Sequence, residues 1–451
     1  MADNSALPAD RPRKLYPLGP LEETFRFISQ RFNGDGNAAL IVRLAGRLEP
    51  EPLAGALAAL QRRHPRLRAR IVPDAEGRHC YEILDRVPPI PLEIKDFPDD
   101  ELPWEAEGLA VVAERFDLSA GPFLRVKVLR SATGRASELI INFHHAIVDG
   151  VSGSRVIHEV MANYEALAGG TSLGALQASQ ALLPLVPEPI PQLTAPLWDR
   201  AEMFLRMVRG YIRKRRRKWT PLPNDSAAYN PRFERASLSK EDSGLLVRRC
   251  RAMKVPTYGA MFAAALSSMA QCLGEGTWRL AARCPIDARG LPGAPEELSD
   301  EHLGCFVTGL DRVYKVRPPV PFWEIAHQAC EDCRRFIRKQ GPAMAIRLLP
   351  LANRGAKVFN ITTARPPMRD SLSVDYMPCS GLRQQYAGMA VEAFSGVNRN
   401  RFLGVSAIVG GFSLKNQMSF TIGTVDVSEA FRRDFQQAFF EMLQKVIHQR
   451  V

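Results

Sequence analysis

Residues 141–153 read INFHHAIVDGVSG, in which two adjacent histidines follow an apolar run. The apolar residues 139–143 predict a buried β-strand. His144 and His145 then lie where the chain leaves the core, and the ends of strands in α/β folds commonly carry chemistry. Because neighbouring residues of an extended segment point in opposite directions, one imidazole can face a crevice while the other packs inward.

An acid and a glycine complete this stretch, and three interpretations are open. Gly150 permits a backbone angle or a close approach that a side chain would forbid. The histidines could pack without a chemical role, or they could form a metal site with Asp149, the one further ligand at a suitable interval. In the third interpretation one histidine is a general base, since imidazole titrates near neutrality and can take a proton from an alcohol or amine.

The composition indicates a globular protein with more than one lobe. The 451 residues exceed the size of a single core, and 46% hydrophobic with 24% charged residues excludes a disordered or fibrous chain. The first residues, MADNSALPADRPRK, lack the apolar region of a secretory signal, and no stretch has the ~18 uninterrupted apolar residues that span a bilayer. We therefore expect a cytoplasmic protein, with peripheral contact at the inner membrane surface left open.

The cysteine pattern predicts no bound metal. In a cytoplasmic chain the eight cysteines are expected to be free thiols. Cys330 and Cys333 form a lone CxxC pair in a helical pattern, whereas a zinc site needs a second pair at a suitable spacing.

Two α/β patterns separated by a proline-rich stretch predict a lobe over residues 1–180, a linker over 181–231 and a lobe over 232–451. The linker contains PLVPEPIPQ, which carries four prolines. In the first lobe, hydrophobic periodicity predicts helices at 20–32, 52–62 and 154–167 and strands at 38–44, 123–129 and 138–143. In the second lobe it predicts helices at 245–253, 258–273, 322–339 and 428–448, strands at 279–284, 303–316 and 357–362, and a hairpin of 405–414 with 417–422.

The pattern HHxxxDG at residues 144–150 resembles the signature of the chloramphenicol-acetyltransferase-like superfamily, which includes condensation domains, polyketide-associated acyltransferases and wax ester synthases. RHPRLRARI at 63–71 looks like the RHExLRTxF segment of condensation domains, and LGCFVTG at 303–309 is similar to their VGxFVNT. PIDARG at 285–290 lies about where those domains place an arginine. PLGPLEETF at 17–25 and the continuation HHAIVDGVSG look like segments of wax ester synthases.

The resemblance implies an α/β (α+β) protein of two chloramphenicol-acetyltransferase-like lobes. Each lobe is a mixed sheet with flanking helices, and an active-site tunnel between the lobes receives one substrate from each face. His145 is then the general base, next to the motif residue Gly150, and His144 has a packing role. Asp149 is expected to pair with an arginine and orient the loop, and Arg289 is the candidate partner, because an unpaired buried carboxylate is costly.

The resemblance further implies an acyltransferase of the O-acyl type. The acyl group would come from a thioester of coenzyme A or of phosphopantetheine on an acyl or peptidyl carrier protein, used as co-substrate with no tightly bound cofactor. The acceptor would be the hydroxyl of a small molecule or lipid, giving an ester in lipid or secondary-metabolite biosynthesis. Direct transfer of the acyl group in a ternary complex is expected, without an acyl-enzyme. Candidate donors to the oxyanion are Asn360, Thr362 and Thr363.

Two alternatives to ester formation remain open at this point. One is an amide-forming nonribosomal peptide condensation enzyme. The other is a catalytically inactive module that docks a carrier protein.

Residues 197–219, LWDRAEMFLRMVRGYIRKRRRKW, predict a basic amphipathic helix. Half of the net charge of +12 lies in its hexabasic run, which comprises Arg213, Lys214, Arg215, Arg216, Arg217 and Lys218. Such a helix suits an anionic membrane surface, and it could equally grip an acidic carrier protein or coenzyme A phosphates. The plainer interpretation is a packed helix with a solvated tail. No recognisable module indicates nucleic-acid binding.

Overall fold

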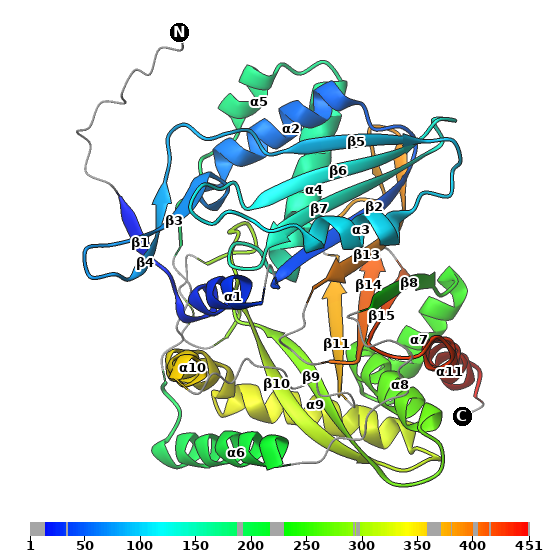
Figure 1. Cartoon of the computed structure of the whole chain (residues 1–451). Coiled ribbons are helices and arrows are strands. Elements are labelled where there is room, and N and C mark those ends of the chain that lie inside the picture. The colour runs from blue at the N-terminus through cyan, green and yellow to red at the C-terminus, as the bar shows by residue number, and fades with distance from the viewer. Residues whose placement is uncertain are drawn as a thin grey trace.

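The computed structural model describes residues 14–32, 35–186, 193–216, 230–291, 294, 298–358, 371–379, 381–399, 405–414 and 416–449. Within these residues the strands form two six-stranded sheets and one three-stranded sheet, with helices packed against them (Figure 1). The predicted fold class, two lobes that each contain a mixed sheet with flanking helices, is confirmed.

The first large sheet carries the two adjacent histidines at the end of a central strand. Its order is β12-β13-β2-β7-β6-β5, and these strands comprise Gln385–Tyr386, Met389–Asn398, Asn37–Ala45, Ala136–His144, Leu124–Ser131 and Leu92–Phe97. Neighbouring strands are antiparallel except β5 and β6. All nine residues of β7 are buried, because both faces of the strand are covered.

Helices lie on both sides of this sheet. Helices α2 (Pro50–Arg63) and α4 (Gly150–Ala168) pack on the face to which Ile141 points, and α3 (Trp104–Ala113) packs on the face to which Ile140 points (Figure 1). The alternation of side chains along β7 therefore feeds two separate hydrophobic clusters.

Short elements complete the first lobe. Its small sheet has the order β1-β4-β3, comprising Leu15–Pro17, His79–Ile83 and Ala69–Pro73. The remaining elements are α1 (Pro20–Arg31), the 3₁₀ helix η1 (Pro65–Arg68) and α5 (Leu173–Ser179). Helix α5 lies in a segment for which the sequence analysis predicted no helix.

The second large sheet has the order β10-β9-β11-β14-β15-β8. Its strands comprise Val307–Val316, Trp278–Asp287, Ser371–Pro378, Ala407–Leu414, Gln417–Val425 and Pro231–Ser237. Strand β11 runs parallel to β9 and β14, and the other pairs are antiparallel. One core joins this sheet to the helices α7 (Lys240–Ala252), α8 (Thr257–Cys272), α9 (Phe322–Arg338) and α11 (Glu429–His448).

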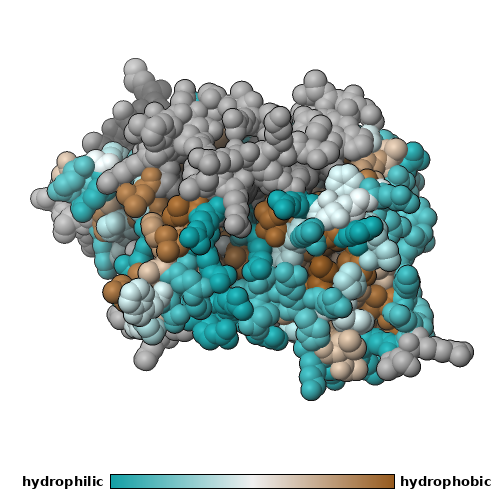
Figure 2. Space-filling view, turned by 90° about the horizontal axis from the view of Figure 1, so that it is seen from below, coloured by the Kyte–Doolittle hydropathy of each residue, from teal (hydrophilic) through white to brown (hydrophobic). Residues whose placement is uncertain are grey.

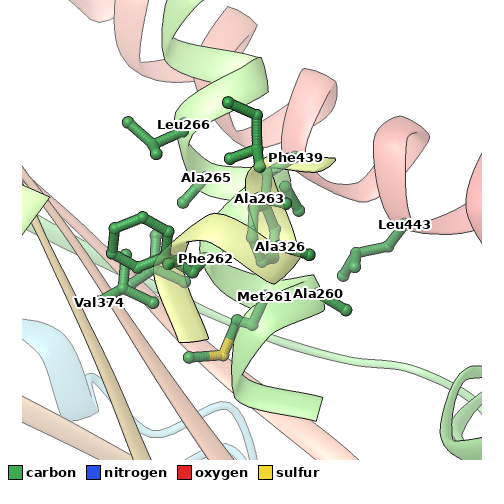
Figure 3. Close-up of a cluster of buried hydrophobic side chains, with 14 of the residues drawn as sticks. Ala260, Met261, Phe262, Ala263, Ala265, Leu266, Ala326, Val374, Phe439 and Leu443 are labelled. Carbon is green, nitrogen blue, oxygen red and sulfur yellow. The ribbon is translucent and has the colours of Figure 1, made fainter. Parts of the chain in front are cut away.

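Helix α8 forms the centre of this core because small residues allow its neighbours to approach closely. Figure 3 shows its alanines between Val374 of β11, Ala326 of α9 and Leu443 of α11. At Gly259 a Cβ atom would lie 2.6 Å from the sulfur of Cys330 and 3.2 Å from the carbonyl oxygen of Ala326, both on α9. Any side chain at this position would push α8 and α9 apart.

Helices α6 (Leu197–Arg216) and α10 (Gly341–Val358) contact each other, and α10 also contacts α1. The prediction of a strand at residues 357–362 is wrong for residues 357 and 358, which form the end of helix α10. Residues 359–362 lie outside the described residues. The prediction rested on the β-branched residues of a short apolar segment, but its first two residues continue a helical turn. The hairpin predicted from 405–414 and 417–422 is present as β14 and β15.

Strand β13 crosses from the second lobe to the first. By sequence it belongs to the segment 232–451, yet it pairs antiparallel with β2 from Ala390 opposite Ala45 to Asn398 opposite Ala38. It also touches the second sheet, where the rings of Phe394 and Phe412 lie 4.7 Å apart. The division predicted at residue 232 did not anticipate this exchange, since nothing local distinguishes a strand that pairs with its own lobe from one that crosses.

Candidate active site

His144 is a buried residue at the last position of β7. Its side chain is fully enclosed, with the rings of Phe116 and Phe123 at 6.2 and 6.4 Å. Its Nδ1 accepts a hydrogen bond from the backbone N–H of Ala146 (3.2 Å). Burial lowers the pKa of His144 to about 3, and the neighbouring His145 adds to this effect. The imidazole is therefore neutral and packed in the fold, as a residue without access to substrate would be.

His145 turns the other way and is partly exposed. Its ring stacks on Phe25 of α1, with centroids 4.6 Å apart and planes at 15°, and it meets the edge of Phe143 at 5.9 Å. Its Nδ1 atom is buried. Burial lowers the pKa of His145 below its ordinary value, although the charge of Asp149 opposes this shift. The ring is therefore held in a fixed orientation as a neutral imidazole, the form that can accept a proton.

Asp149 is the N-cap residue of α4 and accepts hydrogen bonds from two backbone groups. Its carboxylate accepts from the N–H of Ser152 (2.8 Å) and from the N–H of Phe306 (2.9 Å). Its own backbone N–H donates to the carbonyl of Gly304 (3.1 Å). The loop after β7 is thereby tied to residues 304–306, which lie 152 to 157 positions further along the chain.

Arg289 lies against Asp149 and forms a buried ion pair with its carboxylate. The Nη1 and Nη2 atoms of Arg289 donate to the two carboxylate oxygens at 2.9 and 3.1 Å, and Nη2 also donates to the hydroxyl of Ser152 (2.6 Å). Nη1 makes a further bond to Asp287 (2.9 Å), and the guanidinium lies 4.6 Å from the ring of Phe306. Burial alone would raise the pKa of Asp149, but the cation and the N–H donors outweigh it and hold that pKa below its ordinary value. The carboxylate is therefore ionised and fully engaged, which suits an orienting role.

Gly150 begins α4 at a point of close approach to the second lobe. A Cβ atom at this position would lie 3.2 Å from the sulfur of Met377 in β11. Of the two explanations open from the sequence, close approach applies, because Gly150 is not among the glycines with positive φ. The start of α4 is therefore packed directly against the second lobe.

The remaining predicted site residues cannot be placed. Asn360, Thr362 and Thr363 lie outside the described residues, as do Arg217 and Lys218. Arg213, Lys214, Arg215 and Arg216 belong to α6, but their side chains are not described. Among the described residues, no helix combines the length and the apolar character needed to cross a bilayer.

Residues 13–182 match the family model described as Condensation domain. A stretch of 154 residues is 30% identical to one of the plipastatin synthase proteins of Bacillus subtilis (strain 168), and this alignment covers 34% of the chain and 6% of that protein. The chain thus spans a small fraction of the length of the curated relatives that it matches.

Solved structures match nearly the whole chain. The first condensation domain of the calcium-dependent antibiotic synthetase, in complex with a substrate analogue, has a TM-score of 0.69 at 15% identity and covers 97% of each chain. This chain has the condensation-domain fold. Polyketide synthase associated protein 5 from Mycobacterium tuberculosis gives a TM-score of 0.63 at 16% identity, over 97% of this chain and 100% of that one. A variant of the starter condensation domain of rhizomide synthetase, in complex with C8-CoA, gives 0.64 at 15% identity, over 96% and 95% of the two chains. The resemblance drawn from the short motifs is confirmed.

Arg66 is a buried residue that supports the site through its hydrogen bonds. The sequence analysis did not single it out. Its side chain is buried and donates to the carboxylate of Glu22 (2.7 Å) and to the carbonyls of Leu303 (2.8 Å) and Val186 (2.9 Å). The guanidinium also lies 5.7 Å from the ring of Tyr81, whose hydroxyl donates to the carbonyl after His145 (2.9 Å). Arg66 therefore joins α1, the 303–306 loop and the loop that carries the histidines.

Glu159 anchors α4 to the end of α2. Its carboxylate accepts from Arg63 (2.8 Å) and contacts the Nε2 of His64 (3.0 Å), while Arg63 also donates to Glu301 (3.0 Å). The basic residues of these clusters lie in RHPRLRARI, a segment that the sequence analysis matched as a whole without giving a role to any of its residues. Their acidic partners carried no signal, since Glu22 lies 44 residues from Arg66 and Glu159 lies 95 from His64.

The described part of the condensation-domain fold has a groove of about 650 Å³ where the lobes meet around β13. Residues of β13 and β14, including Phe394 and Phe412, line it together with Glu165 of α4 and Lys240 of α7. Its lining includes neither His145 nor Asp149. The tunnel from both faces to the histidine therefore stays a prediction.

Proposed function

We propose that this chain is an acyltransferase in which His145 is the general base. The observation that carries the proposal is that the three titratable side chains at and after the end of β7 have different environments. His144 is sealed in the core and Asp149 is saturated by Arg289 and backbone donors, whereas the neutral His145 ring is partly exposed. Of these groups, His145 alone combines a neutral ring with partial exposure, which supports its proposed role as the group that accepts a proton from substrate.

The proposed reaction is direct transfer from a thioester to a hydroxyl. The hydroxyl gives its proton to the imidazole while its oxygen forms a bond to the thioester carbonyl carbon. The tetrahedral adduct then collapses, the carbon–sulfur bond breaks, and the leaving thiolate takes the proton back from the imidazolium. Because Nδ1 of His145 is buried, Nε2 is the nitrogen assigned to this proton. General-base assistance of this kind is worth about 10²- to 10⁴-fold in rate.

The donor in this proposal is a thioester of coenzyme A or of a carrier protein, used as co-substrate without a resident cofactor. The C8-CoA in the starter condensation domain supports the former, and the peptide synthetase relatives support the latter. The acceptor is proposed to be a small-molecule or lipid alcohol. The segments at 17–25 and 144–153 that resemble wax ester synthases favour an ester product.

Amide formation is the second candidate function, favoured by the family model over residues 13–182 and by the peptide synthetase relatives. An inactive docking module is the third candidate, and the complete set of His145, Asp149, Gly150 and Arg289 speaks against it.

The purified chain can be tested with medium-chain acyl-CoA and matched alcohol and amine acceptors, with products identified by mass spectrometry. We expect ester formation, and a loss of about 10²- to 10⁴-fold in His145→Ala with an unchanged thermal melt. His448→Ala is the matched control, because this imidazole is exposed on α11 and should leave turnover unchanged. Normal turnover by His145→Ala would refute the proposed base, and amide products alone would favour the second candidate.

A further inference from the structure

Helix α6 is apolar on two opposite sides, and one side is packed. Met203 is buried against Phe336 and Met344, and Met207 joins the same cluster. Asp199 of α6 also faces the packed side, where its carboxylate lies 3.0 Å from the ammonium of Lys339. These contacts fix the orientation of α6 on the second lobe.

The opposite side of α6 presents large apolar side chains to solvent. We call this the outer face of α6, and its members are Leu197 (69% exposed), Trp198 (85%), Phe204 (43%), Leu205 (49%) and Val208 (36%). At 100° per residue these positions fall on one side of a helix, away from Met203 and Met207. Figure 2, seen from the side on which Figure 1 places α6, shows apolar residues exposed among hydrophilic ones. A cluster of this kind on a folded protein marks an interaction surface.

The charges along α6 select the kind of partner. No Asp or Glu occurs from residue 203 to residue 224, whereas Arg206, Arg209 and the hexabasic run 213–218 fall in that interval. The two acidic residues of the helix lie before this interval and form ion pairs. Asp199 pairs with Lys339, and Glu202 pairs with Lys339 and Arg206. The outer face is therefore apolar with a basic continuation, which requires a partner that is apolar inside and anionic at its surface.

We propose that α6 docks the protein on an anionic lipid surface, with the outer face inserted at the level of the headgroups. Amphipathic interfacial helices combine apolar insertion with basic side chains at the headgroups, and tryptophan is enriched at that depth. A purely electrostatic partner such as an acidic protein would use the basic run but leave the outer face of α6 in water. The lipid surface uses both features, and the inference is independent of the proposed reaction.

The test is co-sedimentation of the full chain with vesicles of phosphatidylcholine alone or mixed with phosphatidylglycerol. We expect at least about tenfold stronger partitioning to the anionic vesicles, since basic side chains are attracted to a negatively charged lipid surface. The variant Trp198→Ser/Phe204→Ser/Leu205→Ser should lose at least about tenfold. The matched control is Leu173→Ser/Leu182→Ser, which removes two exposed leucines elsewhere (36% and 56% exposed) and should bind like the wild type.

A second variant separates charge from insertion. Replacing the six residues 213–218 by glutamine should abolish the preference for anionic over neutral vesicles. A thermal melt on each variant shows that it is folded. Full binding by the triple serine variant, or binding to an acidic carrier protein without binding to vesicles, would overturn the proposal.

Discussion

Removing the guanidinium of Arg289 is expected to destabilise the protein strongly. The Arg289 and Asp149 side chains are 4% and 2% exposed, so Arg289→Met would leave a buried carboxylate held by the N–H groups of Ser152 and Phe306 alone. Breaking a buried ion pair by removing one partner costs about 3–5 kcal/mol in the free energy of unfolding. The loop that carries His145 would keep its bonds to residues 304–306 but lose the guanidinium that holds Asp149 and Ser152 in place, so activity should fall together with stability.

A double-mutant cycle measured by urea denaturation distinguishes this coupling from general damage. Asp149→Asn keeps an acceptor for the N-cap bond but places an amide against the guanidinium, and the double variant removes the mismatch. We expect Asp149→Asn/Arg289→Met to be more stable than the sum of the single losses by about 2 kcal/mol.

The control for this cycle is Arg206→Met, whose guanidinium bonds to Glu202 at 2.7 Å with side chains 47% and 41% exposed. Its loss should be below about 1 kcal/mol. Additive losses in the cycle, or a cost for Arg289→Met no larger than the control, would refute the reasoning.

Three further outcomes follow from the buried groups around the site. His144 has a pKa of about 3 in the fold but about 6.5 in the unfolded chain, so only the unfolded state gains a proton as the pH falls below 6.5. The free energy of unfolding should therefore be lower by about 2 kcal/mol at pH 5 than above pH 6.5, and urea melts under the two conditions should show a smaller difference for His144→Asn than for the wild type. Arg66→Met should cost about 3–5 kcal/mol in the same assay, because it removes a guanidinium bonded to the buried Glu22 carboxylate, and a loss below about 1 kcal/mol would contradict that account. Gly150→Val should lower the free energy of unfolding by about 1–3 kcal/mol because the new side chain meets Met377, and adding Met377→Ala should restore part of that loss. If Met377→Ala restores nothing, the contact with Met377 is not the cause of the loss.

The sequence predicted what depends on local periodicity. The opposite directions of His144 and His145 follow from the two-residue repeat of β7, and the helices 50–63 and 257–272 follow from their apolar spacing. The candidate Arg289 came from a resemblance, since no local pattern indicates which arginine meets Asp149 from 140 residues away.

What the sequence missed depends on tertiary contacts. Glu22 and Glu159 look like ordinary acids of amphipathic helices, and only the folded chain brings basic residues of the 63–71 segment against them. The crossing of β13 is also invisible locally, because a strand carries the same alternation whichever sheet it joins.

The passage of β13 into the first sheet also constrains how chimeras of this chain can be built. A graft that exchanges everything after residue 231 would replace the strand that hydrogen-bonds to β2 and leave its backbone groups dependent on a foreign neighbour. Residues 385–398 should instead travel with the first lobe, as an insertion between two pieces of the second. Recombination between relatives would then respect the hydrogen-bonded units of the fold, which are discontinuous along the gene.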